Sequence, residues 1–119
     1  MGKRRSGEDI HGVILLDKPA GLSSNQALQR VRRLLNARKG GHTGSLDPFA
    51  TGMLPICLGE ASKTAAYLLE ASKVYRAVAH LGKATTSGDL MGELVREQEV
   101  PALGADRINS VLNTFLGDI

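Results

Sequence analysis

The sequence predicts an α+β fold, in which strands and helices are mixed along one chain. Its 119 residues are enough for a single domain with one hydrophobic core. Hydrophobic residues make up 42% of the chain, which is too many for a disordered segment. Strand-like and helix-like segments alternate without the regular spacing of βαβ units, which favours α+β over a doubly wound parallel sheet.

The first expected elements are a strand and a helix. Residues 13–16 are a short apolar run, typical of a buried strand, and a turn containing Pro and Gly follows at 17–21. Residues 24–35 place apolar side chains at helical spacing, and most of the arginines fall off that stripe. The side chain of Ser23 or Ser24 can cap this helix by accepting a free backbone N–H.

The middle of the chain reads as loop, strand and helix. Residues 40–52 are rich in glycine and show no periodicity, so we expect a loop there. Residues 53–58 are apolar and indicate a strand, in which Pro55 favours an edge or irregular position. Residues 60–72 carry apolar side chains at helical spacing.

The last third predicts two strands and a helix. Alternation over residues 74–81 is typical of a strand, and residues 85–88 read as a loop. A short strand is expected around residues 94–95. An apolar stripe over residues 106–116 predicts a final helix with Asp106 as its cap.

Composition and charge limit the classes of function that the chain could have. Residues 1–45 hold nine Lys/Arg against three Asp/Glu, whereas residues 46–119 hold six against nine. This basic first part indicates a polyanionic partner, most often nucleic acid, although a solvated helix face with a flexible basic tail at residues 1–10 explains it equally well. No apolar run approaches 18 residues, so no membrane span or membrane partner is expected. A single cysteine excludes an internal disulfide and suits the cytoplasm.

The loop at residues 41–52 contains the candidate catalytic residue. Asp47 lies at its centre before Pro48, with glycines on both sides that allow unusual backbone angles and close approach. Such a carboxylate could act as a nucleophile, a general base or a metal ligand. The residues alone favour the simpler interpretation of an Asx-turn before proline.

Four segments resemble the TruB family of tRNA pseudouridine synthases. Residues 42–52, HTGSLDPFATG, resemble the catalytic motif of that family, and residues 12–24 resemble its N-terminal motif. Residues 53–63 resemble the segment after the catalytic loop in its bacterial form, and residues 73–76 resemble the strand with the active-site tyrosine. Several ordered motifs at family spacing are far more specific than one short pattern.

The resemblance implies conversion of uridine 55 in the T arm of tRNA to pseudouridine, without a metal or an organic cofactor. Asp47 would be the nucleophile, attacking either C6 of the uracil or C1′ of the ribose. The N-glycosidic bond then breaks, the base turns over, and C5 bonds to the sugar. The uridine must first leave its stack. By resemblance, His42 contacts the RNA, and Tyr75 lies against the uracil as a candidate for the C5 proton transfer.

Basic residues of the first part are plausible RNA phosphate contacts, although a solvated face is an alternative for each of them. These residues are Arg30, Arg32, Arg33, Arg38 and Lys39. Lys18 and Pro19 are expected to brace the catalytic loop rather than to take part in catalysis. At Thr86 the sequence departs from the family, which usually carries Asp there.

The resemblance also implies a mixed, mostly antiparallel sheet flanked by helices. We expect residues 11–119 to be the N-terminal portion of the catalytic domain, incomplete at its C-terminus and without the RNA-binding PUA domain. This part alone is expected to be weak or inactive, and the oligomeric state stays open. A non-catalytic RNA-binding role is the main alternative. An unrelated Asp-dependent hydrolase would need a metal-binding carboxylate cluster, and none stands beside Asp47 in the sequence.

Overall fold

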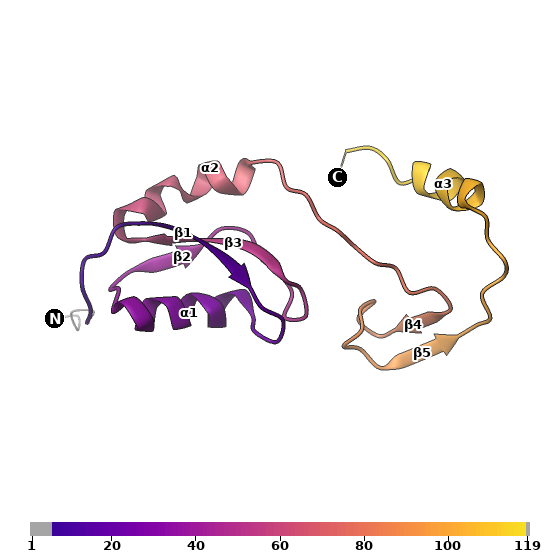
Figure 1. Ribbon diagram of the computed structural model, residues 1–119, viewed down its shortest axis with the longest axis horizontal. Helices are drawn as coiled ribbons and strands as arrows, with labels where there is room; N and C mark the ends of the chain where they lie inside the picture. Colours follow the sequence, from indigo (N-terminus) through magenta and orange to yellow (C-terminus); the bar gives the residue numbers. More distant parts are fainter. Residues whose placement is uncertain (1–5, 119) are drawn as a thin grey trace. The chain divides into compact units, whose positions relative to one another are not determined.

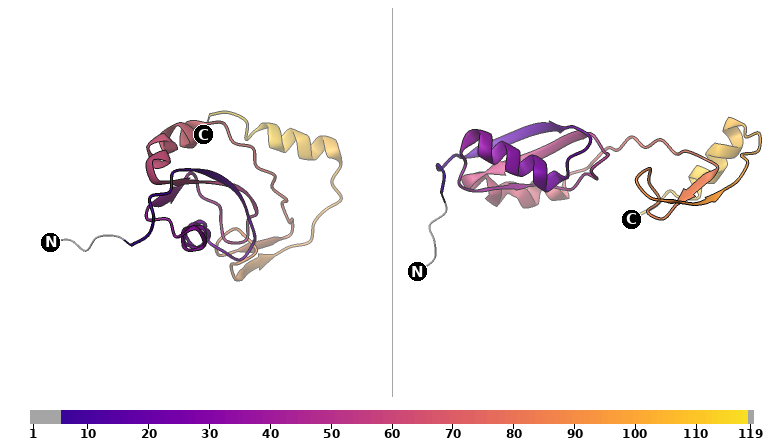
Figure 2. Two further views of the ribbon diagram at one scale, coloured as in Figure 1. Left: turned by 60° about the vertical axis from the view of Figure 1, so that its left-hand side comes forward. Right: turned by 90° about the horizontal axis from the view of Figure 1, so that it is seen from below.

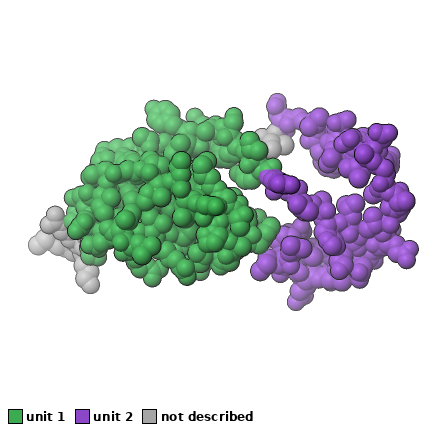
Figure 3. All heavy atoms as spheres, viewed as in Figure 1, with its two compact units in different colours: residues 1–75 green, residues 76–119 purple. Residues whose placement is uncertain are grey.

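The structure is a computed structural model that describes residues 6–118. It divides into two compact units, residues 1–75 and residues 76–119 (Figure 3). Antiparallel strands and helices occur in both units, which confirms the predicted α+β class. Each unit is described below by itself.

The first unit is built on a three-stranded antiparallel sheet (Figure 1). The strands are β1 (Gly12–Lys18), β2 (Gly40–His42) and β3 (Gly52–Leu58), in the order β1-β3-β2. Because β3 pairs with β1 along its whole length and with β2 over three residues, it holds the sheet together. The strand expected at residues 13–16 is therefore confirmed and extends further at both ends.

The helix α1 (Ser24–Leu35) covers one face of this sheet. Ser23, not Ser24, is its N-cap: its hydroxyl accepts the Gln26 N–H while the Gln26 side chain accepts the Ser23 N–H, so two free donors are satisfied. Asn36 ends the helix in the left-handed conformation. The core between sheet and helix contains Leu28, Ala37, Ile56 and Leu58, with Ile10, Ile14, Leu16 and Val31 packed against it.

The segment after β3 is a 3₁₀ helix, η1 (Gly59–Thr64), followed by the short helix α2 (Ala65–Glu70). We expected one helix over residues 60–72, so the region is helical but broken in two. Figures 1 and 2 show α1 on one side of the sheet and α2 on the other. Neither α2 nor the two residues after it buries a side chain, which explains why the apolar spacing did not sustain a longer helix.

Two expectations about the middle of the chain were wrong. The stretch 40–52 was predicted to be loop throughout, yet Gly40–His42 pairs with β3 as β2. Pro55 was expected at an edge or irregular position, yet it lies in the central strand, in regular register opposite Leu15. The Pro55 carbonyl accepts the Thr43 N–H just beyond the end of β2. In a strand, the N and O of one residue point toward the same neighbouring strand, so the nitrogen of Pro55 also faces the β2 side. Because β2 has already ended at this position, the missing N–H removes no hydrogen bond between these strands.

The expected flexible tail falls partly on residues 1–5, which lie outside the described residues. The residues that follow are paired with the end of α1. Glu8 exchanges backbone hydrogen bonds with Asn36 and Arg38, and it forms a parallel bridge with Ala37. The Arg38 guanidinium donates to the Gly7 carbonyl and pairs with Asp9 at 3.3 Å. The packed unit therefore starts before residue 11.

The second unit contains the antiparallel pair β4 (Lys83–Thr85) and β5 (Leu94–Glu97), followed by the helix α3 (Ala105–Asn113). The short strand at 94–95 and the final helix are confirmed, but Gly104 rather than Asp106 is the helix N-cap. Among residues 76–118 no residue is buried. The strand predicted at 74–81 is absent, because no other segment of the described chain pairs with it. None of the described helices is long and apolar enough to cross a membrane.

Candidate active site

Asp47 lies in the connection between β2 and β3, and its side chain is exposed. Its backbone carbonyl accepts the Ala50 N–H at 2.9 Å, which folds residues 47–50 into a tight turn. Within residues 6–118 the carboxylate forms no hydrogen bond and no ion pair. The structure thus presents an exposed carboxylate on a turn, without a partner among the described residues.

Ser24 holds the residue before Asp47 in place. The Ser24 hydroxyl accepts the Leu46 N–H at 2.9 Å and lies 3.1 Å from the Leu46 carbonyl oxygen, to which it can donate. Ser24 is buried and is the first residue of α1, so one end of the loop is fixed to a helix. A loop attached to a rigid element keeps its reactive group in one position, as catalysis requires.

The residue after Asp47 is held as firmly. The Pro48 carbonyl accepts the Gly21 N–H at 2.7 Å and the Lys18 ammonium at 3.3 Å. Both donors belong to the end of β1 and the turn that follows it. Asp47 therefore stands between two residues that are each bonded to the segment 18–24, while its own side chain stays free.

Lys18 is fully buried at the last position of β1. Its ammonium donates to the carbonyls of Pro19 at 2.8 Å, Leu22 at 2.7 Å and Pro48 at 3.3 Å. An ammonium has three N–H donors, and these three carbonyls can satisfy all of them. The expectation that Lys18 braces the loop is confirmed: this one cation joins the 19–22 turn to the loop that carries Asp47.

His42 is the last residue of β2 and lies on the same connection as Asp47, five positions earlier. Its Nδ1 donates to the Gly44 carbonyl at 2.7 Å. Because a carbonyl can only accept, this bond places a proton on Nδ1, so that in the neutral ring Nε2 is the acceptor. The half-buried ring is thus fixed in one tautomer beside the loop.

Tyr75 is 67% exposed and lies outside every described helix and strand. Its segment nevertheless approaches the loop through Lys73. A Cβ added to Gly44 would lie 3.9 Å from Lys73 Cε, and the Lys73 ammonium donates to the Leu69 and Ala71 carbonyls at the end of α2. Lys73 is therefore bonded to the end of α2, and its side chain lies near Gly44. The structure brings Asp47 and His42 onto one connection, and it does not join the Tyr75 hydroxyl to either of them by a hydrogen bond.

The candidate phosphate contacts differ in how free they are. Arg30 and Lys39 are exposed, as is Arg33, whose Nε donates to the Gln29 carbonyl. Arg38 is bonded to Gly7 and Asp9. An arginine whose N–H groups already donate to other residues of the chain has fewer donors left for a phosphate.

Thr86, where the family usually has Asp, sits in the loop between β4 and β5. Its hydroxyl accepts the Glu93 N–H at 3.1 Å. In the same loop Asp89 accepts the Ser87 hydroxyl and the Met91 N–H. These two hydrogen bonds lower the pKa of Asp89, the hydroxyl contributing most. The Thr86 hydroxyl thus forms a hydrogen bond across the loop between β4 and β5.

Sequence reasoning missed two contributors to the site. Ser24 was considered only as a possible helix cap, but the cap is Ser23. The presence of a second serine next to the cap was the signal that Ser24 could form hydrogen bonds elsewhere. Lys73 was seen as part of a motif but was given no role. Among residues 6–118 no group of three or more His, Cys, Asp or Glu side chains could hold a metal ion.

Comparison with a family model matches residues 32–119 to the TruB family pseudouridylate synthase (N terminal domain). The chain is 57% identical over 116 residues to tRNA pseudouridine synthase B of Salmonella typhimurium strain LT2, and 56% identical to that of Shigella dysenteriae serotype 1. In both cases the match covers 98% of this chain and 37% of the relative. The chain thus spans little more than a third of the length of the curated relatives it matches.

Two solved structures are similar to the chain. One is an H/ACA ribonucleoprotein bound to a substrate RNA containing 2′-deoxyuridine, with a TM-score of 0.61 and 32% identity over 92% of this chain and 29% of that chain. The other is a Cbf5–Nop10–Gar1 complex, with a TM-score of 0.61 and 27% identity over 98% of this chain and 28% of that chain. Both similarities extend over nearly the whole chain.

Proposed function

Because this chain belongs to the TruB family of pseudouridylate synthases, we propose that it carries the nucleophile for isomerising uridine to pseudouridine in the T arm of tRNA, at position 55. The observation that carries the proposal is the free carboxylate of Asp47, held on a turn whose two flanking residues are bonded to the segment 18–24. The chain spans 37% of its relatives, so activity belongs to this chain together with the rest of such an enzyme.

Asp47 is the catalytic residue of this proposal. Its carboxylate attacks C6 of the uracil or C1′ of the ribose and forms a covalent bond, while the N-glycosidic bond breaks. The detached base turns over and C5 bonds to C1′; on the C1′ route this bond displaces the Asp47 carboxylate. C5 then loses its proton to a base and N1 gains one, and on the C6 route the adduct releases Asp47 by elimination. The carboxylate is restored on either route, so the net reaction is an isomerisation that needs no oxidant or reductant.

The substrate must offer an unstacked uridine, because the reacting atoms of a stacked base are covered. His42, fixed with Nε2 as an acceptor, is proposed to contact the RNA beside the extruded nucleotide. Tyr75 is proposed to lie against the uracil and to serve the C5 proton transfer. The proximity of the Lys73 side chain to Gly44 supports this placement, since Tyr75 follows Lys73 by two residues.

Phosphate contacts are proposed for Arg30, Arg33 and Lys39, which are exposed. Arg38 contributes its charge to the same surface, while its guanidinium stays bonded to Gly7 and Asp9. Such contacts add to affinity and weaken with salt.

The test is a chimera in which this chain replaces the matching segment of the Salmonella typhimurium relative. It is incubated with a T-arm hairpin carrying tritium at C5 of the target uridine, and with an anticodon-arm hairpin labelled in the same way. We expect tritium release and pseudouridine from the T-arm hairpin only. A folded chimera that binds the T-arm hairpin and yields no pseudouridine would contradict the proposal and favour a non-catalytic RNA-binding role.

A further inference from the structure

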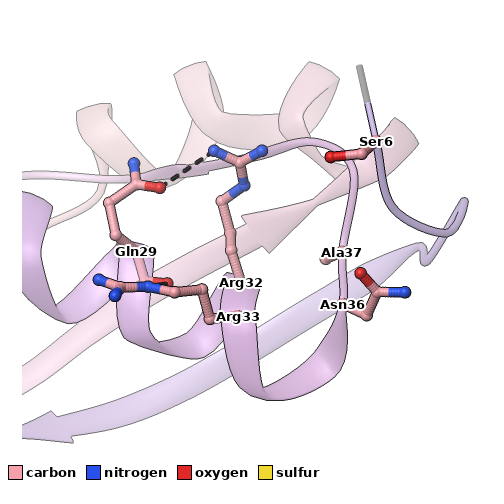
Figure 4. A pocket seen from close by; sticks show the side chains of 6 residues that line it. All are labelled: Ser6, Gln29, Arg32, Arg33, Asn36 and Ala37. Atoms are coloured by element: carbon pink, nitrogen blue, oxygen red, sulfur yellow. Dashed lines mark hydrogen bonds between the residues drawn. The ribbon is translucent and has the colours of Figure 1, made fainter. Parts of the chain in front are cut away.

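A notch of about 330 Å³ opens at the C-terminal end of α1, at the opposite end of this helix from Ser24. Figure 4 shows Gln29, Arg32 and Arg33 along the helix, with Asn36 at its end and Ser6 on the segment that crosses it. Ala37 completes the lining. We call this feature the α1 notch.

The α1 notch is positively charged. Two guanidinium groups line it and no carboxylate does. Within the described residues, ion pairs join Arg38 to Asp9, Lys63 to Glu60 and Lys83 to Glu97, and none involves Arg32 or Arg33. Two neighbouring cations without a counter-charge favour an anionic partner.

Arg32 and Arg33 differ in how many of their hydrogen-bond donors are already bonded within the chain. Arg32 is held by the Gln29 side chain at 3.1 Å and the Arg38 carbonyl at 2.6 Å, and its buried Nε has no hydrogen-bond partner in the described structure. Arg33 is exposed and uses only its Nε, toward the Gln29 carbonyl. Its two terminal amino groups therefore remain available among the described residues and match the geometry of a phosphate.

A helix C-terminus normally repels anions because its last carbonyls carry partial negative charge. Here two of the last four helical carbonyls are occupied by hydrogen bonds, as is the carbonyl of the C-cap residue. The Arg32 carbonyl accepts the Ala37 N–H at 2.9 Å, the Arg33 carbonyl accepts the Asn36 N–H at 3.2 Å, and the Asn36 carbonyl accepts the Glu8 N–H at 2.7 Å. The full charges of two arginines outweigh the partial negative charge that remains at this end.

The position of the notch relates it to Asp47. The first residue of α1, Ser24, is bonded to Leu46 beside Asp47. Arg33 comes nine residues later, which is about 14 Å further along the helix axis at the usual rise per residue. A phosphate in the notch therefore belongs to a part of the RNA away from the reacting uridine.

We propose that the α1 notch binds a backbone phosphate in the stem of the RNA hairpin whose loop uridine meets Asp47. Arg33 donates to the phosphate, and Arg32 supplies fixed positive charge behind it. This inference rests on the proposed function for the choice of RNA, and it adds a second contact point at a set distance from the catalytic loop.

The test measures binding of a T-arm hairpin RNA to the 119-residue chain by fluorescence anisotropy, as a function of salt concentration. Arg33→Gln removes the donor and keeps a good helix former, so α1 is preserved. Arg107→Gln is the matched control, because Arg107 is also an exposed helical arginine, on α3, and the charge change is identical. A second RNA, the isolated loop without its stem, separates stem contacts from loop contacts.

We expect Arg33→Gln to reduce the slope of log affinity against log salt by about 1 for the hairpin. The same variant leaves the slope for the loop RNA unchanged, and Arg107→Gln leaves both unchanged. Three results would each overturn the proposal. The salt slope of Arg33→Gln could equal that of the unsubstituted chain, Arg107→Gln could reduce the slope as much as Arg33→Gln, or Arg33→Gln could reduce the slope for the loop RNA as much as for the hairpin. Binding is read without turnover, so an inactive chimera with a normal Arg33 effect would overturn only the isomerase proposal.

Discussion

At the scale of single residues, the site depends on side chains that never meet the substrate. Lys18 is a buried cation whose partners are all uncharged carbonyls. Its contribution is geometric, because each carbonyl belongs to a turn that flanks Asp47. Ser24 has the same kind of role through the backbone of Leu46. Asp47 stays free because its neighbours are bound.

Lys18→Met keeps most of the side-chain volume and removes all three hydrogen bonds. Three carbonyls then lose the donor that joins the two turns, so we expect the free energy of unfolding to fall by about 2 kcal/mol. Urea denaturation followed by circular dichroism measures it. The control is Lys63→Met, since the pair of Lys63 with Glu60 is exposed to solvent and contributes little to stability. Equal unfolding midpoints for the two variants would contradict the role given to Lys18.

A second residue-scale prediction concerns Asp89. Its pKa is lowered by the Ser87 hydroxyl, with a smaller contribution from the Met91 N–H. The folded chain therefore holds Asp89 ionised below the ordinary aspartate range, and this loop stabilisation is lost only as pH falls through the depressed value. In an NMR titration Ser87→Ala should raise the pKa of Asp89, and Ser110→Ala should leave it unchanged. An unaltered titration in Ser87→Ala would refute this cause.

At the scale of elements, the junction between β3 and η1 is the tightest backbone approach around the sheet. Gly59 has a φ of 58°, and a Cβ there would overlap the Ile10 carbonyl oxygen and His11 Nδ1. The Gly59 N–H also donates to the Lys39 carbonyl at 3.0 Å. The chain can turn from the central strand into the 3₁₀ helix here because this position carries no side chain.

Gly59→Ala should lower the free energy of unfolding by about 2 kcal/mol or more, through left-handed strain together with steric overlap. Gly41→Ala is the matched control, because its φ is not in the left-handed region and a Cβ there meets nothing within 4 Å. Thermal unfolding of both variants measures the difference. If Gly59→Ala proves as stable as Gly41→Ala, the close approach does not constrain the fold.

Element prediction succeeded where the pattern was local. The run at 13–16 and the stripe at 24–35 specify β1 and α1 because their own residues supply the buried faces. The glycine-rich β2 carries no such pattern, and only its pairing with β3 makes it a strand. Alternation at 74–81 looked like a strand, yet a strand needs a paired neighbour as well as alternation. For the site, motifs indicated Asp47, but the anchoring by Ser24 depends on a contact 22 residues away.

At the scale of the whole molecule, burial is unequal between the two units. All residues of the hydrophobic core lie in residues 10–58, and no residue of 76–118 is buried. Residues 71–81 are exposed and belong to no helix or strand. Segments of this kind open locally at low free-energy cost and are the usual sites of proteolysis.

Brief digestion with trypsin should therefore cut first at Lys73 or Arg76 and leave a resistant product that contains β1, α1 and β3. Mass spectrometry of the early products identifies the site. The arginines of α1 serve as an internal control, because their backbone is held in a packed helix. An initial cut at Arg30 or Arg33 would contradict this distribution of stability.

The central claim is that Asp47 is the nucleophile, and one measurement tests it most directly. Tritium release from C5-labelled T-arm RNA is compared among the chimera, its Asp47→Asn variant and its Asp106→Asn variant, which removes an exposed carboxylate from α3. The account predicts that Asp47→Asn lowers the rate by at least about a thousandfold, with RNA binding retained, and that Asp106→Asn has no effect. An Asp47→Asn chimera that releases tritium at the unsubstituted rate would contradict it.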